Sequence, residues 1–262
     1  MRYVYGHEMR QGWKTLLLWG TCVGGMGMAC ILLYSGLREE MAGMAESFAS
    51  MGAFAAAFGM DRLSIATLKG FFATEVGTIH GLGGAMFAAV VSTTMLSKEE
   101  DGRTGEFLFS LPLARWKVVW TKWCVTCTNL LLFHLLCTAF YGLGFVLLGE
   151  GIPGKELFLY HVMQLMLGLE VAGICFAASA FFRQNRLGTG LGLVLFFYAL
   201  DLMGRVAPEA EKLSFFSPFS YANAAEILST GKTAAGSALF GGVVLFLALG
   251  IAHVKYVRKD LA

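Results

Sequence analysis

Five ionisable side chains lie inside long apolar runs and are the residues best placed to do chemistry. They are Glu75, His80, His134, Glu170 and Asp201. A charged group at the centre of a membrane-spanning helix costs about 2.5–3.5 kcal/mol on insertion scales, so each needs a physical reason to be there. Carboxylates and imidazoles in such places relay protons or contact a polar substrate. The alternative is a structural role, in which a neighbouring helix satisfies each group or the group lies near the interface.

The spacing of these residues does not predict a metal or acid–base centre. Glu75 and His80 are five residues apart, about 140° around a helix, so they do not share a face. No pair has clear metal-ligand spacing, and no catalytic dyad stands out. Glu170, the most central of the group, His80 and Glu75 are therefore candidates for polar groups along a substrate path. No catalytic residue and no metal site are predicted.

Three short motifs resemble cofactor-binding sequences but lack the context that such sites need. The GKT sequence at 231–233 ends like a P-loop, yet Glu226 stands where the first glycine of that motif belongs. The glycines at 188–192 open an apolar run with no strand before it, so they form no dinucleotide loop. The C-x-x-C at 124–127 lacks the βαβ context of a redox site. The chain is therefore expected to bind no cofactor, ATP included.

The composition predicts an all-α polytopic membrane protein. Of 262 residues, 56% are hydrophobic and 15% charged, whereas about a quarter are charged in soluble domains. Crossing about 30 Å of hydrocarbon takes roughly 20 apolar residues, and such runs recur along the chain. Residues 1–14 mix aromatic and charged side chains, which predicts an N-terminal interfacial helix. We predict a single transmembrane domain over residues 1–262, with six spans at about 15–36, 73–96, 123–148, 157–182, 187–206 and 236–256.

The distribution of lysine and arginine predicts the orientation of these spans. With a cytoplasmic N-terminus, 13 of the 20 Lys and Arg residues lie on the cytoplasmic side, in keeping with the positive-inside rule. Both termini and the connection at 97–122 are then cytoplasmic. The net charge of +2 is too small to indicate a nucleic-acid partner.

Small residues recur at helical spacing in two of the predicted spans. Gly20, Gly24 and Gly27 do so in the first span, and Gly188 and Gly192 in the fifth. Such stripes let two helices approach closely. We expect these glycines at helix–helix interfaces, with direct contact to a transported substrate as the alternative.

The connection at 97–122, SKEEDGRTGEFLFSLPLARWKVVWTK, is the most densely charged segment of the chain. The acids at 99–101 suit the N-terminus of a helix, and an apolar cluster follows at 107–111. Pro112 ends that piece and suits the first turn of the next helix. Exposed apolar surface usually marks a docking site, so we expect a short helix that docks a cytosolic partner; a helix on the membrane surface is the alternative. The basic residues expected to reach lipid headgroups are Arg115, Lys117 and Lys122.

This segment resembles the cytoplasmic loop between the second and third spans of ABC-2 type transporter permeases. The shared pattern is a group of acids, a glycine, a glutamate, an apolar cluster, Ser-x-Pro and later basic residues. Sequences at 58–72, 213–232 and 257–261 are also similar to that family, so the resemblance covers nearly the whole chain. The chain departs from the pattern in its longer spacing from Gly102 to Glu106. The residues that the resemblance implies for ATPase docking are Glu99, Glu100, Gly102, Arg103, Glu106, Phe107, Leu108, Ser110, Pro112 and Arg115.

The resemblance implies the permease subunit of an ABC exporter, with residues 97–117 as its coupling helix. It implies two ATPase subunits as partners, which bind ATP and Mg²⁺, and a second permease, identical or homologous, that meets the first and fifth spans. It also implies a location in the plasma membrane, as a bacterial inner-membrane protein. A different class is the alternative: a self-sufficient secondary transporter or an integral membrane enzyme that uses Glu170, His80 and Asp201.

Overall fold

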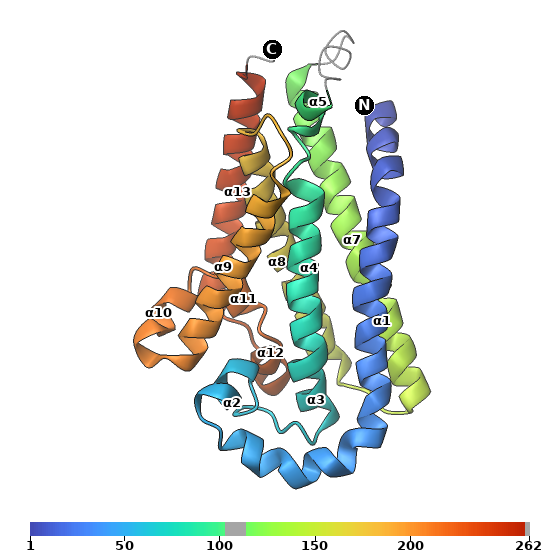
Figure 1. The fold of residues 1–262 in the computed structure, drawn as a ribbon, viewed down its shortest axis with the longest axis vertical. Helices are drawn as coiled ribbons and strands as arrows, with labels where there is room; N and C mark the ends of the chain where they lie inside the picture. Colours follow the sequence, from blue (N-terminus) through green and yellow to red (C-terminus); the bar gives the residue numbers. More distant parts are fainter. Residues whose placement is uncertain (103–113, 260–262) are drawn as a thin grey trace.

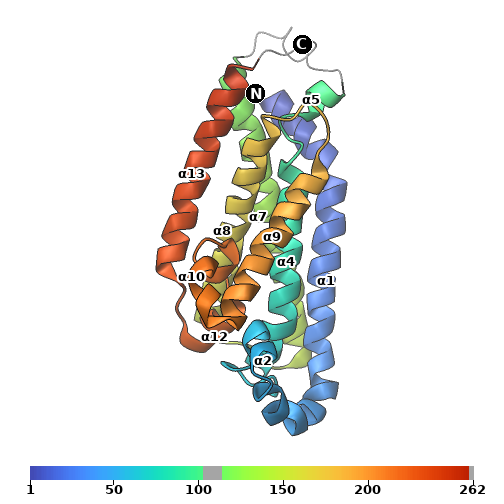
Figure 2. The same cartoon turned by 60° about the vertical axis from the view of Figure 1, so that its left-hand side comes forward.

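The computed structural model describes residues 1–102 and 114–259. Every regular element in these ranges is helical, with no strand, so the predicted all-α class is confirmed. The helices run side by side along the long axis of the molecule (Figures 1 and 2). Within the described ranges, those long and apolar enough to cross a membrane are α1 (Arg2–Ala49), α7 (Arg115–Leu148), α8 (Gly154–Ser179), α9 (Leu187–Val206) and α13 (Ala235–Val257).

The remaining predicted span, 73–96, is built from three consecutive helical segments. The short helix α3 (Leu68–Phe71) passes into a π-helical segment, η1 (Phe72–Val76), and then into α4 (Gly77–Ser92). Together they are about 37 Å long at 1.5 Å per residue, enough to cross the hydrocarbon layer. The run starts before residue 73 because Thr67 caps it, accepting a hydrogen bond from the Gly70 N–H at 3.1 Å.

The predicted interfacial helix at residues 1–14 is not a separate element. α1 runs without a break for 48 residues, which is about 72 Å. No proline interrupts its first turns, and they pack on α7, where Tyr5 donates a hydrogen bond to Thr128 Oγ1 at 2.9 Å. At its other end α1 continues past residue 36 and curves beneath the bundle (Figure 1). The first turns of α1 are therefore part of one long helix that packs on α7.

The connection at 97–122 is partly helical on both of its sides. One turn of helix, α5 (Lys98–Asp101), ends at Gly102. α7 then begins at Arg115, soon after Pro112, and runs on into the span predicted at about 123–148. The part between them, 103–113, lies outside the described residues.

Aromatic rings fill the core where α4, α7 and α8 meet. α4 packs on α8 and α9, and it also contacts α1 and α7 (Figures 1 and 2). Phe87 stacks on Phe133 with ring centroids 4.7 Å apart, and Phe72 makes edge contacts with Tyr141 and Tyr160. All five rings are fully buried. Each such pair contributes about 0.5–1.5 kcal/mol beyond the burial of its area.

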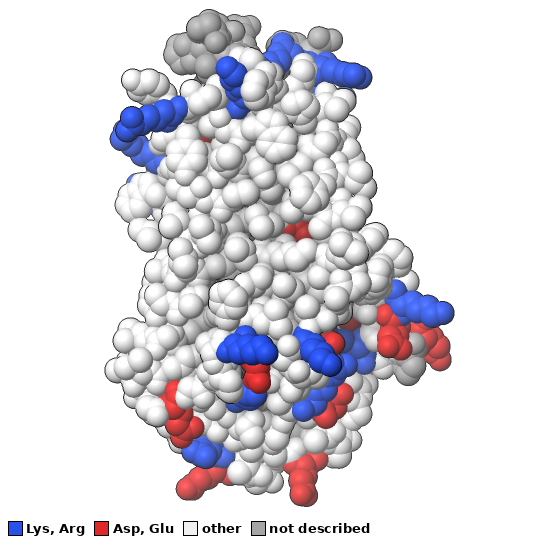
Figure 3. Space-filling model, turned by 180° about the vertical axis from the view of Figure 1, so that it is seen from behind, with Lys and Arg blue, Asp and Glu red and all other residues white. Residues whose placement is uncertain are grey.

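The two ends of the bundle carry different structural elements. Both termini and α5 lie at one end, which we call the terminal end (Figures 1 and 2). Figure 3 shows charged side chains gathered toward the two ends, with a broad, nearly uncharged band between them. Such a band is what a helical bundle presents to hydrocarbon. The opposite end carries the short helices α2 (Ala53–Phe58), α10 (Glu211–Ser214), α11 (Pro218–Tyr221) and α12 (Ala224–Thr230), with the 3-10 turn η2 (Pro208–Ala210).

Candidate functional site

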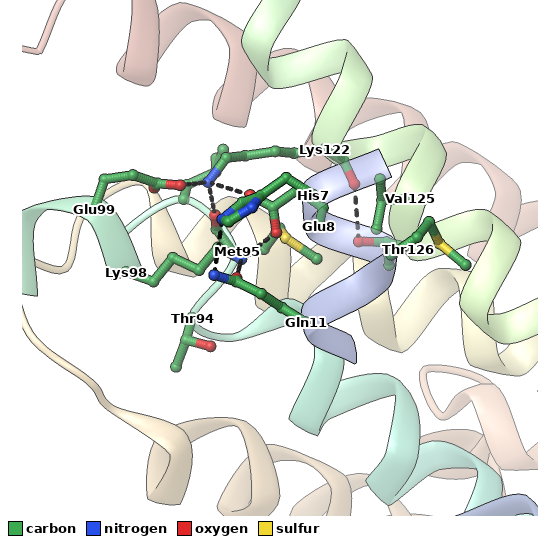
Figure 4. A network of polar contacts seen from close by, with 12 residues as sticks. His7, Glu8, Gln11, Thr94, Met95, Lys98, Glu99, Lys122, Val125 and Thr126 are labelled. Carbon is green, nitrogen blue, oxygen red and sulfur yellow. Dashed lines mark hydrogen bonds and ion pairs between the residues drawn. The ribbon is translucent and has the colours of Figure 1, made fainter. Parts of the chain in front are cut away.

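A buried ion-pair network lies at the terminal end, where α5 meets α1 and α7 (Figure 4). Lys122 of α7 is at its centre: the side chain is 0% exposed, and its Nζ donates to the Met95 carbonyl oxygen at 2.6 Å. The same ammonium pairs with Glu99 of α5 and lies 3.5 Å from Oε1 of Glu8 in α1. Lys98 pairs with the other carboxylate oxygen of Glu8. Two ammonium groups and two carboxylates from three helices thus neutralise one another.

The burial of Lys122 corrects one expectation from the sequence. Lys122 was expected to reach lipid headgroups, but two carboxylates and a carbonyl oxygen of its own chain satisfy the ammonium inside the bundle. Removing one partner of a buried ion pair typically costs about 3–5 kcal/mol, because the other charge stays behind without compensation. The network therefore holds α5 firmly against α1 and α7.

A second set of contacts attaches α5 to the C-terminal segment. Glu100 pairs with Lys259 Nζ at 2.5 Å, and the same Nζ donates to the Phe182 carbonyl oxygen, between α8 and α9, at 2.7 Å. Arg115, the first residue of α7, donates to the Lys259 carbonyl oxygen at 2.7 Å. The described residues on both sides of 103–113 are thus bonded to the same C-terminal segment.

Four of the residues expected to dock an ATPase lie in the described ranges. The side chains of Glu99 and Glu100 are only 12% and 10% exposed and pair with lysines of this chain. They therefore attach α5 to the bundle. Gly102 ends α5, and Arg115 begins α7. The other expected docking residues lie outside the described residues: Arg103, Glu106, Phe107, Leu108, Ser110 and Pro112.

Sequence analysis did not predict Glu8, Lys98 or Lys259 as members of the site. Each is a charge near the end of an apolar run, where residues usually face the membrane surface and carry no special signal. The pairing of Glu8 with Lys98 joins residues 90 positions apart in the chain. Only the packing of α1 on α7 brings them together.

Three histidines from α4, α7 and α8 meet in the middle of the bundle. His80 is fully buried; its Nδ1 lies 2.8 Å from the Tyr141 hydroxyl and its Nε2 lies 3.0 Å from Nδ1 of His134. The ring of His161 is 5.7 Å from that of His80. Interhelical hydrogen bonds therefore satisfy His80, which favours the structural alternative. Among the residues that the structure describes, no three His, Cys, Asp or Glu side chains are arranged to hold a metal ion.

Glu170 and Glu75 lie in different environments. Tyr221 donates a hydrogen bond to Oε2 of Glu170 at 2.7 Å, and Gly241 leaves room for that carboxylate, because a Cβ there would lie 2.2 Å from Oε2. Burial, and then the negative charge of Glu170, raise the pKa of the Tyr221 phenol well above its ordinary value, so the phenol remains a donor. Glu75 is half-buried in η1. Within the described ranges, no hydrogen bond or ion pair links either carboxylate to His80.

Asp201 also has a partner of its own. It is 2% exposed and forms an ion pair with Arg205, one turn further along α9. Arg205 in turn donates to the Ala57 carbonyl oxygen at 3.2 Å. His80, Glu170 and Asp201 therefore take part in three separate sets of bonds and do not converge on one centre.

Comparison with known protein families gives a match over almost the full length of the chain. The sequence profile of ABC-2 family transporter proteins matches residues 3–261. The chain belongs to the ABC-2 family. The resemblance of the 97–122 segment to such permeases is thereby confirmed, and the chain is a multi-pass membrane protein and a transport subunit of an ABC transporter. No curated protein matches the chain.

In this ABC-2 permease the glycines expected to pack helices fall into two groups. A Cβ at Gly20, Gly24 or Gly27 would lie 2.6, 2.7 and 2.3 Å from side-chain atoms of α7. These three glycines are therefore used inside the chain, between α1 and α7. A Cβ at Gly188 or Gly192 would have nothing within 4 Å. That face of α9 is thus free of contacts with the rest of the described permease.

Proposed function

We propose that this permease is the membrane subunit of an ABC exporter, driven by two separate ATP-binding subunits that dock on residues 97–117. Membership of the ABC-2 family supports the transport role. The observation that carries the proposal is the attachment of this segment on both sides. α5 is bonded to α1, to α7 and to the C-terminal segment, and the start of α7 is bonded to that segment too.

Residues 97–117 act as the coupling helix in this proposal. Closure of the ATPase around its nucleotide displaces residues 103–113, and the ion pairs of Glu99 and Glu100 carry the displacement to Lys122 and Lys259. Charges paired away from water resist separation. α5 and the spanning helices therefore move together instead of sliding past one another.

A second permease, identical or homologous, completes the translocation path. The open face of Gly188 and Gly192 supports α9 as a contact between the two permeases, because small residues without neighbours let a second helix approach closely. The glycines of α1 already face α7. We therefore assign the dimer contact to α9 and not to Gly20, Gly24 and Gly27.

We assign the terminal end to the cytoplasm and the permease to the plasma membrane, as a bacterial inner-membrane protein. The excess of lysine and arginine in the termini and in the connections at 97–122 and 183–186 supports this orientation. Both termini and α5 lie at one end, as it requires. ATP and Mg²⁺ bind to the partner ATPases, which dock there.

A self-sufficient secondary transporter or membrane enzyme gains no support from the described residues. It would need Glu170, His80 and Asp201 to act together. Each of these side chains is instead bonded to a different neighbour.

Purification of the tagged chain from its native membranes tests the proposal. We expect an ATP-binding subunit to co-purify and its ATP turnover in liposomes to fall by roughly tenfold in Glu106→Ala or Pro112→Ala, equivalent to about 1.4 kcal/mol, with membrane insertion unchanged. Lys155→Ala, exposed at the opposite end, is the control and leaves turnover unchanged. Unaltered turnover after replacement of residues 103–112 by a Gly-Ser linker contradicts the proposal.

A further inference from the structure

A polar cavity of about 560 Å³ opens at the end of the bundle opposite the termini. It lies between the end of α9, α10, α12 and the loop after α2, and the first turn of α13 closes one side. Its volume is in the range of small-molecule sites, about 300–1,000 Å³. None of the residues discussed for ATPase coupling lines it.

The charges around this cavity do not balance. Its lining includes four carboxylates and two guanidinium groups. Each guanidinium is already paired: Arg62 with Glu226 at 3.2 Å, and Arg205 with Asp201. The remaining carboxylates, Asp61 and Glu211, have no ion-pair partner in the described ranges, and both are exposed. The cavity therefore presents a net negative charge to anything that enters it.

A serine hydroxyl also belongs to the lining of the cavity. Ser237, in the first turn of α13, is 6% exposed as a whole residue. Its hydroxyl forms no hydrogen bond with any described residue, and its oxygen is accessible and not sealed inside the protein. That hydroxyl is therefore available to a ligand in the cavity. Phe215 and Val206 add apolar wall to the same space.

We propose that this cavity binds a small organic cation with an apolar part, such as an amphiphilic amine. The ammonium group lies between Asp61 and Glu211, Ser237 bonds to a polar atom of the ligand, and the apolar part lies against Phe215. A cation gains from both unpaired carboxylates, whereas an anion is repelled by them. Binding does not require the ATP-driven transport proposed above, because every group involved belongs to this chain.

Titration of the purified full-length chain with dansylcadaverine, a fluorescent amphiphilic amine, tests the proposal. The assay contains no ATPase, so its outcome is independent of the exporter assignment. We expect saturable binding and an affinity at least about tenfold lower for the uncharged N-acetylated probe. Asp61→Asn with Glu211→Gln lowers the affinity of the amine by about tenfold, as expected for the loss of two partly solvated charge contacts. Ser237→Ala lowers it less.

Glu39→Gln with Glu40→Gln is the matched control, since these exposed acids of α1 lie outside the cavity. It removes the same charge and leaves the affinity unchanged, and gel filtration verifies that all variants are folded. Non-saturable uptake into micelles, equal binding of the acetylated probe, or equal affinity of the Asp61/Glu211 variant and the wild type overturns the proposal. An equal loss in the control variant also overturns it.

Discussion

The side chain of Lys122 is fully buried, and three oxygen atoms replace the water that its ammonium group loses. The Met95 carbonyl and the carboxylates of Glu8 and Glu99 surround its ammonium group. Desolvation of an ammonium costs several kcal/mol, which only close opposite charges and hydrogen bonds offset. Buried polar groups without a full charge also need partners, and deeper in the bundle the Tyr141 hydroxyl forms a hydrogen bond with His80.

We expect Lys122→Met to lower the free energy of unfolding by about 3–5 kcal/mol, because the buried carboxylates that face it lose their counter-charge. Thermal melting of the purified chain in detergent measures the effect. Lys117→Met, exposed on the same helix, is the control and changes stability by less than about 0.5 kcal/mol. Adding Glu8→Gln and Glu99→Gln to Lys122→Met restores part of the loss. Equal melting temperatures for the two single variants would disprove the role of the network.

Tyr141→Phe removes the hydroxyl bonded to His80 Nδ1 and leaves a buried polar atom unsatisfied. The expected cost is about 1–3 kcal/mol. Tyr3→Phe, at a side chain that is 92% exposed, is the control and has no effect on melting. A Tyr141→Phe variant as stable as the wild type would show that this hydrogen bond does not matter for the fold.

At the scale of elements, α1 and α7 make the most extensive contact between described helices, and glycines of α1 let side chains of α7 approach its backbone closely. The three glycines of α1 that face α7 leave no room for a methyl group, as the approach of Phe140 to Gly24 illustrates. Dispersion contacts between closely packed helices drive association where the surrounding lipid is as apolar as the side chains. This packing also carries Glu8 to its lysine partners.

Gly24→Leu should destabilise the bundle by about 1–3 kcal/mol, the usual cost of overpacking. A Cβ there would lie 2.7 Å from the Phe140 ring and 3.1 Å from the Cys137 Cα, which is backbone. Gly25→Leu is a matched control one position further along, where nothing lies within 4 Å. It keeps full stability in a melting assay. The reverse order of stability would contradict the observed α1–α7 contact.

The sequence allowed the spans to be predicted because the length of an apolar run reflects the thickness of the hydrocarbon layer. It did not predict that α1 is continuous, since the polar residues before residue 15 lack a helix breaker but look like a surface segment. The three-part construction of the second span was also missed, because the η1 segment has no composition signal of its own. The ion-pair network depends on which helices pack together, and no local pattern encodes the pairing of Glu8 with Lys98.

At the scale of the whole molecule, the two ends differ in structure. The terminal end gathers α5, the start of α7 and the C-terminal segment into one bonded unit. The opposite end holds the short helices and the polar cavity. A nearly uncharged band separates them (Figure 3). In the exporter proposed above, the terminal end would dock the ATPases and the opposite end would be the face of release.

Reporter fusions test the orientation. We expect green fluorescent protein fused to the C-terminus to fluoresce, and alkaline phosphatase inserted after Gly151, between α7 and α8, to be active, because the positive-inside rule puts the terminal end in the cytoplasm. The opposite pattern of activities would reverse the orientation and with it the side on which the ATPases dock.

The central claim is that a separate ATPase grips the segment between α5 and α7. Photo-crosslinking from an artificial amino acid at position 108 tests it most directly, with position 147, exposed near the opposite end of α7, as the control. The account predicts a covalent adduct with the ATP-binding subunit from position 108 and none from position 147. An intact complex in which position 108 reacts only with lipid or solvent would contradict it.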